Sequence, residues 1–186
     1  SEMGSAKLLP KLIMKGEAAG PFDVILLSTK AYHLDQAIED VRPYVGENTI
    51  ILPLLNGMAH FEKLDQKFGK EKVIGGLCYI EATLDREGAI IQKGPMHTVI
   101  FGERTGEKTD RILKLAAAFE GTKVNFQLSM NIEQELWNKY LFIATMSGIT
   151  TIMRAPIGPI CELPSGKETI KRLINEIITV MQKVGA

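Results

Sequence analysis

The chain has 186 residues, of which 45% are hydrophobic and 24% charged, the proportions of an ordinary globular protein with one or two domains. Lysine plus arginine and aspartate plus glutamate both number 22, so no net charge attracts nucleic acid or an anionic membrane. The two cysteines and three histidines lack metal-ligand spacing and no apolar run reaches the roughly 20 residues that span a bilayer, so we expect no metal, no membrane span and a cytoplasmic location.

The first part of the chain alternates apolar runs with amphipathic segments. The apolar run at residues 24–27 is typical of a strand buried on both faces, and residues 31–43 have helical spacing that ends at a proline. A second strand is predicted over residues 48–57, then a helix that closes at Gly69, then a third strand over residues 72–80. This order predicts an α/β fold with part of a Rossmann-type, doubly wound sheet.

The pattern changes after this third strand. Turn signals between residues 80 and 103 separate short apolar segments, which predicts an antiparallel extension of the sheet. Residues 109–120 have the spacing of a helix, and residues 123–129 alternate as in a half-buried strand.

After Ser129 the pattern is helical. Two pairs, Asn131 with Gln134 and Ser165 with Glu168, resemble capping boxes, and a Pro/Gly-rich connection lies between the two helices that they open. The second helix carries an apolar stripe formed by Ile170, Leu173, Ile174, Ile177, Ile178, Met181 and Val184. We therefore expect an α/β part over residues 1–128 and the start of an all-helical domain over residues 129–186.

Polar residues follow two of the predicted strands, where open α/β sheets bind their ligands. Thr29 and Lys30 follow the first strand, and Asn56 with Gly57 follows the second. Lys30 offers a cation to a phosphate or carboxylate, and the Asn56 amide can both donate and accept a hydrogen bond. The alternative is that Lys30 opens a solvated helix and that Asn-Gly is simply a turn.

Lys139 lies between Trp137 and Tyr140 at the head of an apolar helical run. Lysine is rarely buried unless a partner or a reaction uses it. Burial in a cleft lowers the pKa of a lysine, which can then pass a proton at neutral pH. The alternative is a surface lysine paired with Glu135, four residues earlier. Ser147 reads as a helix residue that faces a ligand, and the chain lacks the Gly-rich loop G-x-G-x-x-G.

Three motifs, "DVILLSTKAY", "ILPLLNGM" and "ELWNKYLFIATMSGITTIMRAPIGPI", resemble in their order and spacing the ketopantoate reductase (2-dehydropantoate 2-reductase) family. The resemblance covers most of residues 21–186 and implies reduction of ketopantoate by NADPH, which gives pantoate for pantothenate and coenzyme A synthesis. It also implies that residues 1–128 belong to the NADP-binding Rossmann-like domain and residues 129–186 to the helical substrate domain, with the active site in the cleft between the two domains.

The resemblance gives each candidate residue a role. Lys139 matches the catalytic lysine that protonates the forming alkoxide. Thr29 and Lys30 fall at the cofactor cleft, and Asn56 matches an asparagine that contacts cofactor and substrate. Ser147 stands at a substrate-binding position where many members carry an asparagine. Ile143 stands at a position where those members carry a second asparagine.

The resemblance also implies that this chain is the middle of a longer protein. The Gly-rich loop and first βαβ unit of the family are expected before residue 1, and its substrate-binding serine and carboxylate beyond Ala186. Two alternatives stay open. One is a related reductase of another 2-keto acid, favoured by Ile143 and Ser147; the other is an inactive, truncated module that self-associates, for instance as a homodimer, through sheet edges and an apolar helix face.

Overall fold

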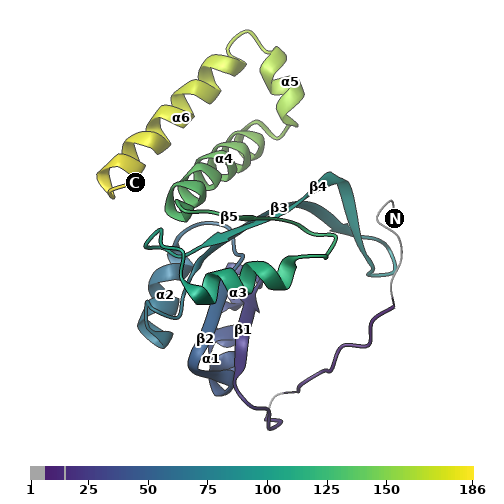
Figure 1. Cartoon of the computed structure of the whole chain (residues 1–186). Coiled ribbons are helices and arrows are strands. Elements are labelled where there is room, and N and C mark those ends of the chain that lie inside the picture. The colour runs from purple at the N-terminus through teal and green to yellow at the C-terminus, as the bar shows by residue number, and fades with distance from the viewer. Residues whose placement is uncertain (1–6, 15) are drawn as a thin grey trace. The chain divides into compact units, whose positions relative to one another are not determined.

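The computed structural model describes residues 7–14 and 16–186, which divide into two compact units (Figure 1). The first unit is α/β and the second is helical, which confirms the predicted fold class. The units are Ser1–Leu55 with Ala59–Ile132, and Asn56–Met58 with Glu133–Ala186. The assignment of residues 1–128 and 129–186 to a cofactor domain and a substrate domain stays a prediction.

The first unit alternates strands and helices as the apolar pattern predicts. Its strands are β1 (Phe22–Leu27), β2 (Val45–Pro53), β3 (Gly75–Leu84), β4 (Ile90–Gly102) and β5 (Asn125–Leu128). Its helices are α1 (Leu34–Val41), α2 (Ala59–Phe68) and α3 (Asp110–Phe119), with short 3-10 helices η1 (Ala31–His33) and η2 (Arg42–Tyr44).

The strands pair in both directions. β1 runs parallel to β2, with Leu27 opposite Pro53 at their carboxyl ends. Ile51 of β2 forms a further parallel bridge with Val73, just before β3. β3 is antiparallel to β4, which confirms the extension predicted over residues 80–103, and β4 is parallel to β5.

β2 is buried on both faces, and successive side chains of a strand point to opposite sides. β1 is confirmed as a strand, but the prediction that it is buried on both faces is wrong: Leu26 is 55% exposed, because β1 pairs only with β2 among the described residues. Ile50 and Leu52 share a core with Ile112 and Leu115 of α3. Ile51, which is fully buried, lies between them in the strand and therefore faces the other side, where Figure 1 places α1 behind the strands. The end of β2 is thus packed on both faces.

Two glycines let the chain that leads into the second unit lie directly on the sheet. A Cβ added at Gly102 of β4 would stand 2.1 Å from Ser129 O, and one at Gly75 of β3 would stand 2.6 Å from Ile132 Cγ1. Both positions therefore need glycine for close approach. They fix residues 129–132, the segment that opens the helix carrying Lys139.

The second unit contains three helices, α4 (Ile132–Met153), α5 (Ile157–Glu162) and α6 (Gly166–Lys183). α5 is not predicted, because its Pro/Gly content is typical of an irregular connection. Proline is compatible with a helix start, and Pro156 supplies the fixed φ of −62° just before α5 begins. α4 approaches α6 at Gly148, where a Cβ would lie 3.4 Å from Leu173 Cδ2.

Both predicted capping boxes are wrong. Ser165 makes no side-chain cap because its φ and ψ of −99° and −1° are in the helical region, whereas a capping residue needs an extended backbone. Glu168 instead pairs with Arg172. At the start of α4, Asn131 N donates to Ser129 Oγ at 3.1 Å and the Gln134 side chain donates to Asn138, so Gln134 does not close a box.

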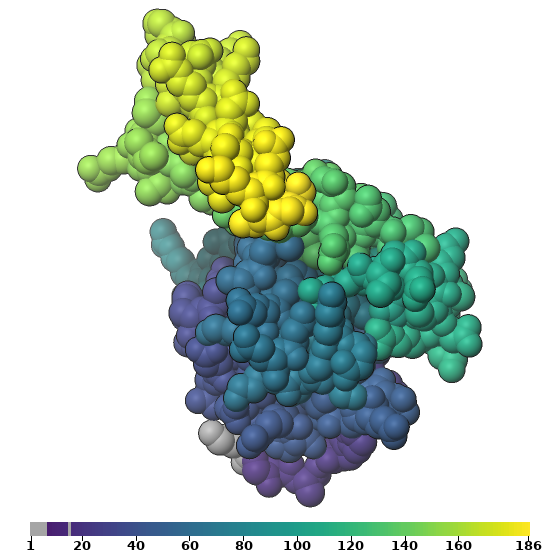
Figure 2. Space-filling model, turned by 90° about the vertical axis from the view of Figure 1, so that its left-hand side faces the viewer, coloured from purple at the N-terminus to yellow at the C-terminus, as the bar shows by residue number. Residues whose placement is uncertain are grey.

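One side of α6 is open to solvent. Figure 2 shows this helix in yellow, and Val180 is among its exposed side chains, as is Val184 just after its end. Within residues 7–14 and 16–186, no helix combines the length and the apolarity that a membrane span requires.

Candidate functional site

The first candidate region is the carboxyl edge of β1 and β2. The parallel register sets Leu27 opposite Pro53, and Leu54 N donates a hydrogen bond of 2.8 Å to Leu27 O. The segments that follow the two strands therefore leave from one edge of the sheet. Ligands of open α/β sheets bind beyond this edge.

Thr29 carries a polar atom that lacks a partner at this edge. Its Oγ1 is buried and makes no hydrogen bond with any residue that the structure describes. A buried hydroxyl without a partner costs about 1–3 kcal/mol, so such atoms are uncommon in folded proteins. The Thr29 hydroxyl therefore lacks a hydrogen-bond partner among the described residues.

Lys30 follows in an extended conformation, with φ and ψ of −72° and 149°, and its side chain is exposed. Its carbonyl oxygen accepts a hydrogen bond from His33 N at 2.9 Å, which closes η1. Lys30 therefore opens a short helical segment and also presents a cation one residue after the Thr29 hydroxyl. Both interpretations of its sequence position are compatible with this geometry.

Asn56 and Gly57 form a bend after β2. Gly57 has a φ of +87°, in the left-handed region that favours glycine, and nothing lies within 4 Å of where its Cβ would be. Glycine is therefore required here by the backbone and leaves open space beside the chain. Asn56 is exposed, and by its contacts it belongs to the helical unit.

Lys139 is buried, with an exposed fraction of 6%. This burial disagrees with the interpretation of Lys139 as a solvated surface lysine. Trp137 and Tyr140 beside it pack edge to face, with ring centroids 5.8 Å apart. A buried ammonium in a helix of mostly apolar residues is a group that electrostatic catalysis can use.

Ile143 and Ser147 follow Lys139 at intervals of four residues, so the three side chains share one face of α4. Ile143 is half-buried and Ser147 is exposed. The face therefore presents a cation, then an aliphatic side chain, then a hydroxyl. Thr145, on a different face, also has a buried hydroxyl without a partner among the described residues, and no sequence pattern singles it out.

A second buried charge, Glu103, has a structural role. Its carboxylate accepts hydrogen bonds from Thr109 Oγ1 at 2.5 Å and from Arg111 Nε and Nη2, both at 2.6 Å. Burial raises the pKa of Glu103, but the hydrogen bonds from Arg111 and Thr109 and the charge of Arg111 outweigh it, so the pKa lies below its usual value. Thr109 also caps α3 by accepting from Ile112 N, so this cluster secures that helix.

Comparison with known proteins agrees with both units. Residues 1–106 match the family "Ketopantoate reductase PanE/ApbA", and residues 131–186 match "Ketopantoate reductase PanE/ApbA C terminal".

No group of three His, Cys, Asp or Glu side chains that could hold a metal ion occurs among the residues that the structure describes.

Three known proteins are similar to this chain in sequence or structure. An "uncharacterized oxidoreductase YkpB" of Bacillus subtilis is 46% identical over 100% of this chain and 61% of its own length. A 2-dehydropantoate 2-reductase of Aquifex aeolicus is 27% identical over 87% of this chain and 52% of its own length. The crystal structure of the 2-dehydropantoate 2-reductase of Geobacter metallireducens superposes with a TM-score of 0.77 at 28% identity, over 86% of this chain and 53% of that one. The chain thus spans between half and two thirds of the length of these relatives.

Proposed function

The chain belongs to the ketopantoate reductase family of oxidoreductases, and on that premise we propose that it serves the NADPH-dependent reduction of 2-dehydropantoate (ketopantoate) to pantoate. This reaction supplies pantothenate and coenzyme A biosynthesis, and the proposal sets it in the cytoplasm. The observation that carries the proposal is Lys139, a lysine buried to 6% exposure in the helix that opens the C-terminal family match.

The proposed cofactor contacts come from the α/β unit. NADPH, when bound, supplies the hydride. The unpartnered Thr29 Oγ1 fits a polar group of such a cofactor, because it lies just beyond the carboxyl end of β1. Lys30 offers a charge to the same molecule, and Asn56 offers its amide to cofactor and substrate. Residues 1–128 are proposed as part of the NADP-binding domain.

Lys139 is the proposed proton donor. Reduction of a ketone places a hydride on carbon and leaves negative charge on oxygen. An ammonium in a site shielded from water stabilises that charge in the transition state more than it stabilises the neutral ketone. Lys139 Nζ then gives its proton to the alkoxide, and the neutral amine recovers a proton from solvent. Ser147 would hold the substrate from two turns further along α4.

A second candidate substrate is a 2-keto acid with an alkyl side chain. Ile143 favours it, because helical side chains lean toward the N-terminus and Ile143 therefore lies over the turn that carries Lys139. An isoleucine cannot pair with the hydroxyl of ketopantoate, but it packs well against an alkyl group. The 46% identical relative is named only as an oxidoreductase, which is compatible with either substrate.

The test is NADPH oxidation by a chimera in which the Bacillus subtilis relative supplies the length that this chain does not span. Ketopantoate is compared with 3-methyl-2-oxobutanoate, which has the same skeleton without the hydroxymethyl group. A kcat/KM about tenfold higher for ketopantoate supports the first candidate, and the reverse order supports the second. Turnover of neither substrate, with no NADPH binding, contradicts the proposal and favours a self-associating, non-catalytic module.

A further inference from the structure

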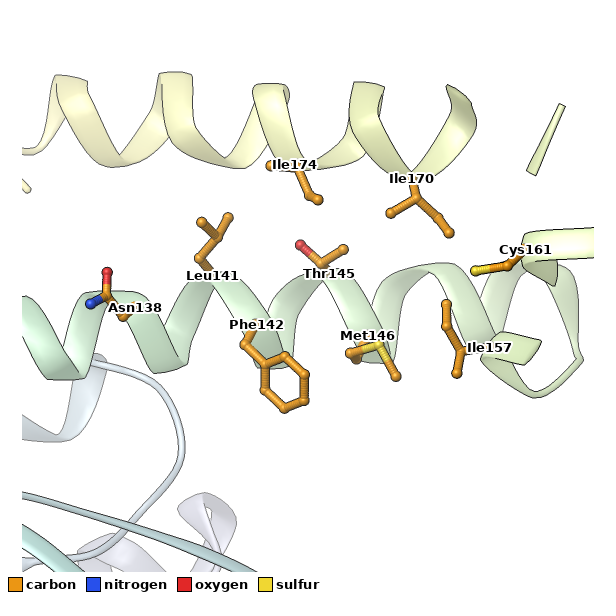
Figure 3. A pocket seen from close by; sticks show the side chains of 9 residues that line it. All are labelled: Asn138, Leu141, Phe142, Thr145, Met146, Ile157, Cys161, Ile170 and Ile174. Atoms are coloured by element: carbon orange, nitrogen blue, oxygen red, sulfur yellow. The ribbon is translucent and has the colours of Figure 1, made fainter. Parts of the chain in front are cut away.

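The helical unit contains a cavity of about 390 Å³ between α4, α5 and α6. Figure 3 shows its walls: Leu141 and Thr145 rise from α4, while Ile170 and Ile174 point down toward them from α6. Cys161 of α5 lies at one end. Ligand pockets in proteins typically have about 300–1,000 Å³, so this cavity is large enough for a small organic molecule.

Thr145 is the polar group inside this cavity. Its exposed fraction is 6%, and its Oγ1 is buried without a hydrogen-bond partner among the described residues. Three other helical threonines of this unit, Thr150, Thr169 and Thr179, each donate to the carbonyl oxygen four residues earlier, at 2.6–2.9 Å. Thr145 does not use this bond. In Figure 3 its oxygen lies on the side of α4 that faces α6.

The rest of the lining sets the chemistry of the occupant. No charged side chain lines the cavity, and its surface is mostly aliphatic. Asn138 stands at one end, but its Oδ1 already accepts a hydrogen bond from Gln134 at 3.0 Å. An ion would lose its hydration without compensation in such surroundings. A neutral, mostly alkyl molecule with one hydroxyl or carbonyl would fill the space and satisfy Thr145.

We propose that this cavity is a binding site for a compact, neutral, mostly alkyl molecule that carries one hydrogen-bonding group, which pairs with Thr145 Oγ1. Thr145 lies on a different face of α4 from Lys139, whereas two other lining residues, Phe142 and Met146, follow Lys139 by three and seven residues and share its face. Residues at intervals of four share a face, and Thr145 follows Lys139 by six residues, on the row of Leu141. The proposal rests on the cavity and on the Thr145 hydroxyl, and it needs no step of the proposed reaction.

The probe is menthol, a neutral alkyl alcohol, titrated into the 186-residue chain and followed by amide NMR shifts. We expect saturable shifts confined to α4, α5 and α6, together with slower alkylation of Cys161 by iodoacetamide. Thr145→Val should weaken binding about tenfold, because it keeps the shape and removes the hydroxyl, whereas Thr145→Ser should stay within about twofold of the wild type. Thr150→Val is the matched control, because Thr150 already bonds to Met146 O.

Three results would overturn the proposal. The first is an absence of saturable shifts in the three helices of a folded wild type. The second is equal binding by Thr145→Val and the wild type. The third comes from diluting the protein without menthol: the same amides shift and Cys161 becomes more reactive. Dilution would then have separated two copies of the chain, and the cavity would be their interface. Menthane carboxylate, which has a similar skeleton and a charge, should bind much more weakly than menthol.

Discussion

Leu27 lies opposite Pro53 at the carboxyl ends of β1 and β2, and the hydrogen bond from Leu54 N to Leu27 O extends this register by one residue. The register fixes where the chain leaves the sheet after each strand. Thr29, two residues beyond Leu27, therefore places its buried, unpartnered hydroxyl beyond the carboxyl edge of a parallel pair, the edge at which open α/β sheets bind ligands.

Thr29→Val should weaken NADPH binding by the chimera about tenfold, because the variant keeps the volume and removes one hydrogen-bonding group. It should raise the free energy of unfolding by up to about 1–3 kcal/mol, since it removes a buried hydroxyl that has no partner within the described chain. Isothermal titration and urea unfolding give the two quantities. Thr49→Val is the contrast: Thr49 Oγ1 donates to Phe22 O at 2.6 Å and accepts from Gly46 N at 2.7 Å, so its loss should cost about 1–3 kcal/mol. Equal NADPH affinity in wild type and Thr29→Val would remove Thr29 from the cofactor contacts.

Ile143→Asn tests which keto acid the proposed site prefers. An amide one turn after Lys139 could pair with the hydroxyl of ketopantoate, which an isoleucine cannot do. We expect the ratio of kcat/KM for ketopantoate to that for 3-methyl-2-oxobutanoate to rise about tenfold in the chimera. Ile152→Asn is the control, because Ile152 is exposed near the end of the same helix. An unchanged ratio in Ile143→Asn would mean that this side chain does not contact the substrate.

Acid should destabilise the protein partly through Glu103. Its pKa in the folded protein lies below the usual value of 4.5, so the folded state favours the ionised form. The stabilisation is therefore complete above the unfolded pKa and is lost as the pH falls through the folded pKa.

Glu103→Gln should lower the free energy of unfolding at neutral pH by about 1–3 kcal/mol, because Arg111 and Thr109 lose an ionised acceptor. The difference from wild type should begin to shrink below about pH 4.5 and should vanish only below the lower pKa of the folded protein, where the wild-type carboxyl is also protonated. Urea unfolding across this range measures it. Glu87→Gln, at an exposed turn, should change neither quantity. A difference that stays constant with pH would show that the charge of Glu103 has no part in the stabilisation.

Two glycines of the helical unit should respond differently to alanine. A Cβ at Gly166 would stand 1.7 Å from Ile160 O, whereas a Cβ at Gly158 would meet nothing within 4 Å. Gly166→Ala should therefore destabilise the packing of α6 against α5 by about 1–3 kcal/mol or more. Gly158→Ala, within α5, should be neutral or slightly stabilising. Thermal unfolding compares them, and equal melting temperatures would contradict the close approach at Gly166.

The close approach at Gly166 also explains why the start of α6 could not be predicted from the sequence. Ser165 and Glu168 have the spacing of a capping box, but the backbone at Ser165 is helical, and the start of α6 is set by the contact of Gly166 with Ile160 O. That contact depends on α5, whose prolines are typical of a loop. The spacing of residues within α6 cannot reveal a constraint that comes from α5, the helix before it.

The α/β unit is more predictable because its strands are marked by apolar runs between turn signals. The structure confirms strands at the apolar runs 24–27 and 50–52, but only the second is buried on both faces, since Leu26 is exposed. Lys139 can be singled out as a candidate site residue from the sequence alone, because it lies in a motif with a fixed order and spacing. The unpartnered hydroxyls of Thr29 and Thr145 are different, because only the packed structure decides whether a threonine finds a partner.

Single-turnover NADPH oxidation by the chimera, with and without Lys139→Met, tests the central claim most directly. Methionine fills a similar volume without the ammonium, and Lys171→Met, at an exposed position of α6, is the control. We expect the rate of the reduction step to fall about 10²–10⁴-fold in Lys139→Met, with NADPH affinity unchanged and the control at the wild-type rate. A wild-type rate in Lys139→Met would contradict the account, since the buried lysine would then have no part in the proton transfer.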